Sequence, residues 1–145
     1  MYIKPVYIVG RGNCTEVLTV LGRYEYGERI ETICGKIFKE FAIDRKAQKK
    51  NIKKKYFDDN KRHNLLPVIL EDKFVYVCVK LREKTINNDS AYGLIEVDRI
   101  SKVDDGDETS IVLSDGKAIR CYCDSTNVAC KIQKAKRIKY DLIKN

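Results

Sequence analysis

The stretch 110-SIVLSDGKAIRCYC-123 decides the fold class of this 145-residue chain. It consists of two β-prone runs, 110–113 and 117–123, on either side of Ser114-Asp115-Gly116. An Asp-Gly step supplies the positive φ angles that a tight turn needs, so this stretch predicts a β-hairpin. Because a hairpin joins neighbouring antiparallel strands, we expect an antiparallel sheet.

Further β-prone runs lie on the N-terminal side of this hairpin, and turn-forming residues separate them. They predict two more hairpins, one at the N-terminus and one in the middle of the chain. In chain order the predicted strands are 2–10, 15–22 and a short run at 29–33 that extends the sheet, then 65–70, 74–81 and 92–103. The predicted turns and loops are 11–14, 71–73, 85–90 and 104–107.

Two segments have the periodicity of helices. From Ile33 onward, Ile37, Phe38 and Phe41 fall within roughly 100° of a helical wheel, which predicts an amphipathic helix as far as Ile43. A second helix begins near Ser125, with a Ser or Thr as its N-cap. Its apolar side carries Val128, Ile132, Ala135, Ile138 and Leu142.

These elements predict an α+β fold in a single domain, 1–145. Its antiparallel sheet consists of several hairpins, with one central and one C-terminal helix. The length, and a hydrophobic content of 43%, are typical of one globular domain with its own core. No secretory signal and no apolar run of membrane-spanning length appear in the sequence, so we expect a cytoplasmic protein with no membrane partner. The six cysteines are then reduced thiols.

Most of the net charge lies in one segment. Residues 45–62, RKAQKKNIKKKYFDDNKR, hold nine Lys or Arg against two Asp, a net +7 out of +8 for the whole chain. Concentrated positive charge attracts a polyanion, because phosphate contacts add up as counterions are released. The candidate nucleic-acid-binding residues are Arg45, Lys46, Lys49, Lys50, Lys53, Lys54, Lys55, Lys61 and Arg62, with Lys134 and Arg137 as auxiliaries. The alternative interpretation is a solvated, soluble helix face.

The pattern leaves the conformation of 44–62 open between a solvated helix and a mobile basic loop. Its apolar stripe lapses in the Lys-rich middle and returns only at Ile52 and Tyr56. Lys is a point charge suited to phosphates, whereas a narrow A·T-rich minor groove attracts Arg most strongly. We therefore expect Arg45 and Arg62 to insert into the groove while the lysines contact phosphates.

Neither catalysis nor metal binding is expected. His63 is the only histidine and lies near no nucleophile motif, and Asp is common in turns such as 104–107 for conformational reasons. Cys121 and Cys123 share one face of a predicted strand, and no second close pair completes a zinc site. We expect structural cysteines, no metal, no cofactor and no catalytic residues. A metal-assisted nuclease remains an alternative if carboxylates converge on one cleft.

The order of elements resembles the ComK family of bacterial competence transcription factors. The similarity begins at Cys34 and Phe38, continues at Arg45-Lys46-Ala47 and resumes in the strand–turn–strand of 67–76. It is strongest at 111–117, IVLSDGK, which a Ser-started helix follows. The resemblance implies a DNA-binding activator that recognises A·T-rich boxes through the minor groove, bends the DNA and acts as an oligomer.

The function we expect is therefore that of a transcription regulator that binds double-stranded, A·T-rich DNA. The alternative is an inhibitor, encoded by a phage or mobile element, that binds a host defence complex which handles nucleic acid. A regulator binds A·T-rich duplex by itself. An inhibitor binds its protein target tightly and shows little preference among free DNA duplexes.

Overall fold

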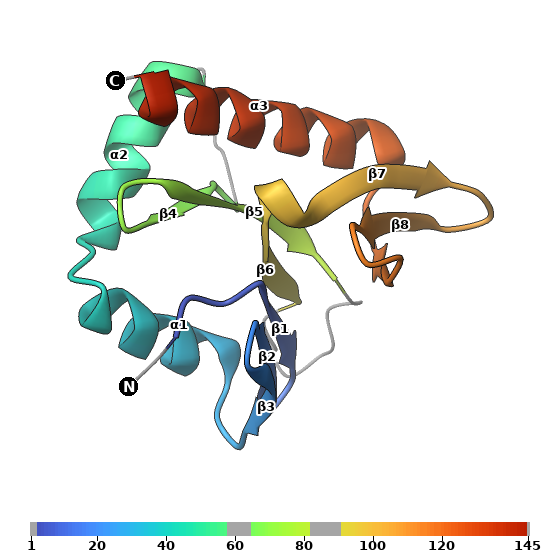
Figure 1. The fold of residues 1–145 in the computed structure, drawn as a ribbon, viewed down its shortest axis with the longest axis horizontal. Coiled ribbons are helices and arrows are strands. Elements are labelled where there is room, and N and C mark those ends of the chain that lie inside the picture. The colour runs from blue at the N-terminus through green and yellow to red at the C-terminus, as the bar shows by residue number, and fades with distance from the viewer. Residues whose placement is uncertain (1–2, 58–64, 82–90, 145) are drawn as a thin grey trace.

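The computed structural model describes residues 3–57, 65–81 and 91–144, which form two antiparallel sheets and three α-helices (Figure 1). The larger sheet has six strands in the order β3-β2-β1-β6-β5-β4, and the smaller has the order β7-β8-β9. The strands are β1 Tyr7–Arg11, β2 Cys14–Thr19, β3 Gly22–Tyr26, β4 Val68–Leu70, β5 Phe74–Lys80, β6 Tyr92–Glu96, β7 Ile100–Asp105, β8 Thr109–Leu113 and β9 Ala118–Cys121. The helices are α1 Ile30–Glu40, α2 Arg45–Tyr56 and α3 Ser125–Lys144, and η1 Val97–Arg99 is a single 3-10 turn. The α+β class with antiparallel sheets is confirmed, with two central helices in place of the expected one.

The six-stranded sheet is covered on both faces, because its strands alternate buried side chains between two clusters. On β5, Val75, Val77 and Val79 join the cluster that contains the apolar side of α3 and the small sheet. Tyr76 and Cys78 point the other way, into the cluster that contains the apolar side of α1. The large sheet is therefore the middle layer of the molecule.

The three predicted hairpins are confirmed. In the first, Arg11 pairs with Cys14, so the turn is tighter than expected. In the second, Leu70 pairs with Phe74. The hairpin 110–123 has Gly116 at φ 91°, and the amide of Leu113 donates to the carbonyl oxygen of Lys117 at 2.8 Å. In all three cases the turn residues in the sequence correctly predicted which strands pair.

The expectation that 29–33 forms a strand is wrong, because α1 begins at Ile30. Ile30, Ile33 and Ile37 are all buried, and their spacing of three and four residues follows a helix. The third strand of the sheet is instead β3, which pairs with β2. The helix also ends at Glu40, earlier than predicted.

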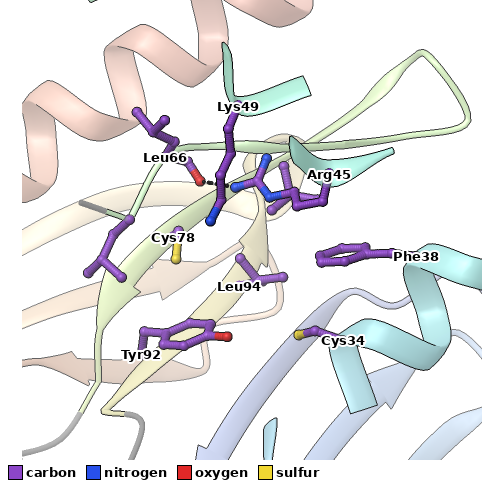
Figure 2. A pocket seen from close by; sticks show the side chains of 10 residues that line it. Cys34, Phe38, Arg45, Lys49, Leu66, Cys78, Tyr92 and Leu94 are labelled. Carbon is purple, nitrogen blue, oxygen red and sulfur yellow. Dashed lines mark hydrogen bonds between the residues drawn. The ribbon is translucent and has the colours of Figure 1, made fainter. Parts of the chain in front are cut away.

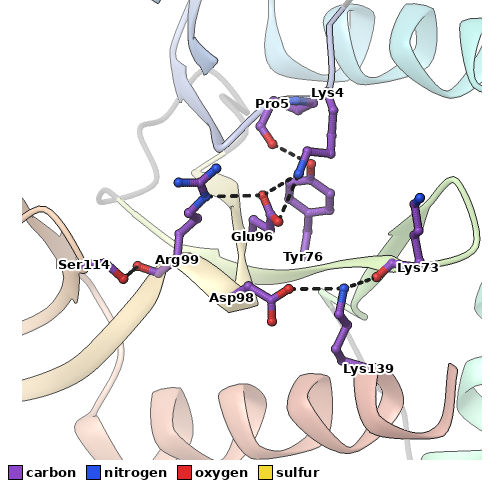
Figure 3. Close-up of polar contacts among 9 residues, drawn as sticks. All are labelled: Lys4, Pro5, Lys73, Tyr76, Glu96, Asp98, Arg99, Ser114 and Lys139. Atoms are coloured by element: carbon purple, nitrogen blue, oxygen red, sulfur yellow. Dashed lines mark hydrogen bonds and ion pairs between the residues drawn. The ribbon is translucent and has the colours of Figure 1, made fainter. Parts of the chain in front are cut away.

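The predicted strand 92–103 is two strands in different sheets. The 3-10 turn η1 separates β6 from β7, and the buried carboxylate of Glu96 lies at this bend. Lys4 approaches this carboxylate at 3.1 Å and Arg99 at 3.9 Å (Figure 3). A buried carboxylate needs such partners, and here they hold the N-terminal arm against the corner between the sheets.

The C-terminal helix is confirmed, but its N-cap is Asp124 rather than a Ser or Thr. The Asp124 carboxylate accepts a hydrogen bond from the amide of Asn127 at 2.8 Å. Asp is as good an N-cap as Ser, since both offer a side-chain oxygen at the right distance. Toward the other end of α3, Lys139 donates to Asp98 at 3.1 Å and to the carbonyl oxygen of Lys73 (Figure 3). Within the described residues, no helix is long and apolar enough to cross a membrane.

Candidate nucleic-acid interface

The basic segment forms a helix, α2, over Arg45–Tyr56. Asp44 caps its N-terminus, where the carboxylate accepts a hydrogen bond from the amide of Ala47 at 3.1 Å. The twelve residues, RKAQKKNIKKKY, include seven Lys or Arg and no acidic residue. The choice between helix and loop is thus settled for this stretch, whereas Lys61, Arg62 and His63 lie outside the described residues.

The first turns of α2 are fastened to the edge of the large sheet. β4 is the edge strand, and the side-chain amide of Gln48 bridges its backbone. Gln48 accepts from the amide of Ile69 at 3.0 Å and donates to the carbonyl oxygen of the same residue at 2.9 Å. Arg45 donates to the carbonyl oxygens of Leu66 and Pro67, both at 2.8 Å. The helix therefore covers an edge that would otherwise offer unpaired backbone groups.

The last turn of α2 is held by α3. The hydroxyl of Tyr56 donates to the Asp141 carboxylate at 2.6 Å. Burial, reinforced by this bond, raises the pKa of Tyr56 to about 12. Lys134 donates to the carbonyl oxygen of Tyr56 at 3.3 Å and stacks over the ring of Phe57 at 4.0 Å. The helix C-terminus thus gains a cation beside its free carbonyl, which favours that end of the helix dipole.

Five of the six lysines of α2 lie on one side of the helix. At 100° per residue, five of them fall within an arc of roughly 140°. We call this surface the lysine face; its members are Lys46, Lys49, Lys50, Lys53 and Lys54. Ile52 is the one buried residue of the helix and lies on the opposite side, against the core. Lys46, Lys50 and Lys54 are therefore exposed on a helix that is fixed from behind, whereas Lys49, at one edge of the arc, lines a cavity between α2 and the large sheet.

Charge repulsion works against this helix. Lys46 and Lys50 are four residues apart, as are Lys50 and Lys54, and like charges at this spacing each cost about 0.2–0.5 kcal/mol. The opposing contributions come from the Asp44 cap, the bridges to β4 and the contact with α3. A bound anion at these lysines would reduce the repulsion.

The structure divides the expected contact residues into two groups. The lysine face is exposed or half-buried, and Arg137 is exposed on α3. Arg45 and Lys134 instead serve as internal anchors, since their donors reach carbonyl oxygens of the protein. Lys55 is exposed on the other flank of α2, 100° beyond Lys54. Sequence reasoning did not find Lys131, which donates to the carbonyl oxygen of Leu65 at 3.4 Å.

The cysteines and acidic residues of the described chain do not gather in one site. No cluster of three His, Cys, Asp or Glu that could hold a metal occurs among the described residues. Cys34, Cys78 and Cys121 are buried, and Cys130 is exposed. Burial raises the pKa of each of the three buried thiols to about 12, so they stay protonated at neutral pH. The acidic turn 104–107 is exposed at the end of the small sheet.

One polar cluster escaped the sequence reasoning, because its members are distant along the chain. The buried carboxylate of Glu16 accepts from the hydroxyl of Tyr7 at 2.6 Å, and Lys117 donates to the same hydroxyl at 2.6 Å. Burial alone would raise the pKa of Glu16, but the Tyr7 hydrogen bond and the charges of Arg11 and Arg23 outweigh it and lower that pKa. The cluster joins the two sheets, and its single carboxylate faces three cations, Arg11, Arg23 and Lys117.

Comparison with known proteins gives no significant similarity: no family model, curated protein or solved structure matches the chain.

Proposed function

We propose that the protein is a DNA-binding regulatory domain that holds duplex DNA against the lysine face of α2. The observation that carries the proposal is the geometry of this helix. Five lysines share one arc, no acidic residue interrupts them, and Arg45, Gln48 and Tyr56 fasten the helix from behind. Because the backbone of this helix is already ordered, its lysines can neutralise several phosphates without the backbone entropy cost that a disordered segment would have.

The length of the helix also suits a duplex. Twelve residues at 1.5 Å per residue extend for about 18 Å, and one α-helix fits the major groove or follows the phosphates along its rim. Arg137 projects from α3 on the flank that carries Lys134 and extends the positive surface beyond α2. We assign binding rather than catalysis to this surface, with double-stranded DNA as the partner.

The preference for A·T-rich DNA and the role as an activator rest on the resemblance to the ComK family. Because Arg45 is an internal anchor, the minor-groove readers within this proposal are Arg62 or Arg137. Competition between an A·T-rich and a G·C-rich duplex at one salt concentration tests the preference. Equal affinity would favour the alternative of an inhibitor that binds a host protein complex.

The lysine face is tested by the double variant Lys50→Glu/Lys54→Glu. If each lysine contacts one phosphate, the plot of log affinity against log salt should flatten by about two units, because each contact contributes about 0.9. Fluorescence anisotropy with a labelled duplex at several salt concentrations measures this slope. Affinity at low salt should fall as well.

The control is Lys102→Glu/Lys136→Glu, which has the same change in net charge. Lys102 lies on β7 in the small sheet, at the far end of the molecule from α2 (Figure 1). Lys136 is exposed on α3, 200° around the helix from Lys134. This variant should retain the wild-type slope. An equal loss in both variants would mean that net charge, and not the lysine face, drives binding.

A further inference from the structure

A cavity of about 180 Å³ lies directly behind the lysine face, between α1, α2 and the large sheet (Figure 2). Its walls are mainly apolar, formed by Phe38, Leu66, Val68 and Leu94, together with the thiols of Cys34 and Cys78. Lys49, Tyr92 and Phe38 are only partly buried or exposed, so the cavity opens to solvent at their side.

The charged residues of the described chain that line this cavity are all positive. Arg45 and Lys49 both line it, and none of the described lining residues is acidic. The side chain of Lys49 extends from α2 into the cavity (Figure 2). Arg45 donates to two carbonyl oxygens and to the Gln48 amide, acceptors that carry no charge to neutralise it. Two cations without a counter-ion in the lining favour an anionic ligand.

A further donor is available from β6. The hydroxyl of Tyr92 points into the cavity (Figure 2). Burial raises the pKa of Tyr92 more than the neighbouring charges do. The hydroxyl therefore keeps its proton and can donate it. No hydrogen bond joins this hydroxyl to another residue in the described part of the chain.

We propose that this cavity binds a small aromatic monocarboxylate, with the ring against Phe38 and Leu94 and the carboxylate facing Lys49 and Tyr92. The size is adequate, since a protein cavity of about 150 Å³ accommodates benzene. Apolar walls with a few convergent polar groups are the usual composition of small-molecule sites. A second cavity, of about 250 Å³, is lined by Tyr7, Glu16 and Lys117, but there a carboxylate stands among the cations and already accepts hydrogen bonds from Tyr7 and Arg11.

The site has a consequence for DNA binding that rests on the proposed function. Lys49 belongs to both the cavity lining and the lysine face. A carboxylate bound to Lys49 removes one of the charges that a duplex would use. Bound ligand should therefore weaken DNA affinity, and bound DNA should weaken ligand affinity by the same factor.

The direct test omits DNA, so its outcome does not depend on the proposed function. Sodium benzoate is titrated into ¹⁵N-labelled protein and amide shifts are followed, with benzyl alcohol and acetate as comparison probes. Benzoate should bind saturably and shift amides of α1, α2 and β6. Benzyl alcohol lacks the charge and acetate lacks the ring, so both should bind at least about tenfold more weakly. Absence of saturable benzoate shifts, or shifts centred elsewhere, would overturn the proposal.

Two neighbouring lysines give a matched pair of variants. Lys49→Gln should weaken benzoate about tenfold, because it removes the charge-assisted contact, while Lys50→Gln should change affinity less than twofold. Tyr92→Phe should also weaken binding. Equal effects of Lys49→Gln and Lys50→Gln would show that general charge and not the cavity attracts the ligand. If benzoate binds as expected but leaves DNA affinity unchanged, only the coupling to DNA is rejected.

Discussion

Ala42 is one of the non-glycine residues in the described chain that have a positive φ angle. It follows the C-cap of α1 at φ 54°, in the left-handed region, which costs a non-glycine residue about 1 kcal/mol. The amide of Ile43 donates to the carbonyl oxygen of Phe38, and the amide of Ala42 donates to that of Lys39. This pattern is a Schellman C-cap, in which glycine normally occupies the left-handed position.

Ala42→Gly should therefore stabilise the protein by about 0.5–1 kcal/mol, and raise the melting temperature by about 1–4 °C. Differential scanning calorimetry measures both. The control is Ala129→Gly, at an exposed position inside α3, where glycine should destabilise by a similar amount. A destabilised Ala42→Gly protein would show that the cap does not have this conformation in solution.

Among the elements, α2 depends most on contacts with distant parts of the chain. Its only buried side chain is Ile52, and its lysines repel one another. The Gln48 bridge to Ile69 spans 21 residues of sequence and fastens the helix to the edge strand. This bridge is what turns a marginal basic helix into a fixed surface.

Gln48→Ala should lower the free energy of unfolding by about 1–3 kcal/mol, because it leaves two backbone groups of β4 without partners. It should also promote association, since an unpaired edge strand is a template for pairing. Urea unfolding and analytical ultracentrifugation measure the two effects. Asn51→Ala is the control, an exposed amide on the same helix, and should change stability by less than about 0.5 kcal/mol. Similar losses in both variants would contradict the role assigned to Gln48.

The sequence was informative where a local rule decides the structure. Three hairpins followed from turn residues, and α3 followed from its apolar stripe. At 29–33, β-branched residues suggested a strand, but tertiary packing selected the helical period of Ile30, Ile33 and Ile37. The bend in 92–103 could not be predicted either, because the partner of Glu96 at the bend is Lys4, which lies 92 residues earlier in the chain.

The same distinction holds for the candidate interface. Composition located the basic segment, but only the helical phase of α2 shows which lysines share a face. The anchoring roles of Arg45 and Lys134 depend on carbonyl oxygens of Leu66 and Tyr56, which no spacing rule identifies. The cavity behind α2 is equally invisible in sequence, since its walls come from five separate segments.

At the scale of the whole molecule, the core contains groups that can ionise only when they are exposed. Cys34 and Cys78 lie on the α1 side of the large sheet, and Cys121 lies on the α3 side. Burial raises the pKa of all three thiols to about 12 in the folded state, against about 8.5 in an unfolded chain. Burial also raises the pKa of Tyr76 and Tyr92.

Stability should therefore fall as the pH rises above about 8.5. The unfolded chain loses thiol protons that the folded protein keeps, so the free energy of unfolding decreases by about 1.4 kcal/mol per pH unit for each buried thiol until the folded pKa is reached. Urea unfolding at pH 8, 9 and 10 gives the slope. Cys78→Ala should reduce the slope by about 1.4 kcal/mol per unit, whatever constant offset the smaller side chain adds. Cys130 is exposed, so Cys130→Ala should leave the slope unchanged. A Cys78→Ala protein with the wild-type slope would mean that this thiol ionises equally in both states.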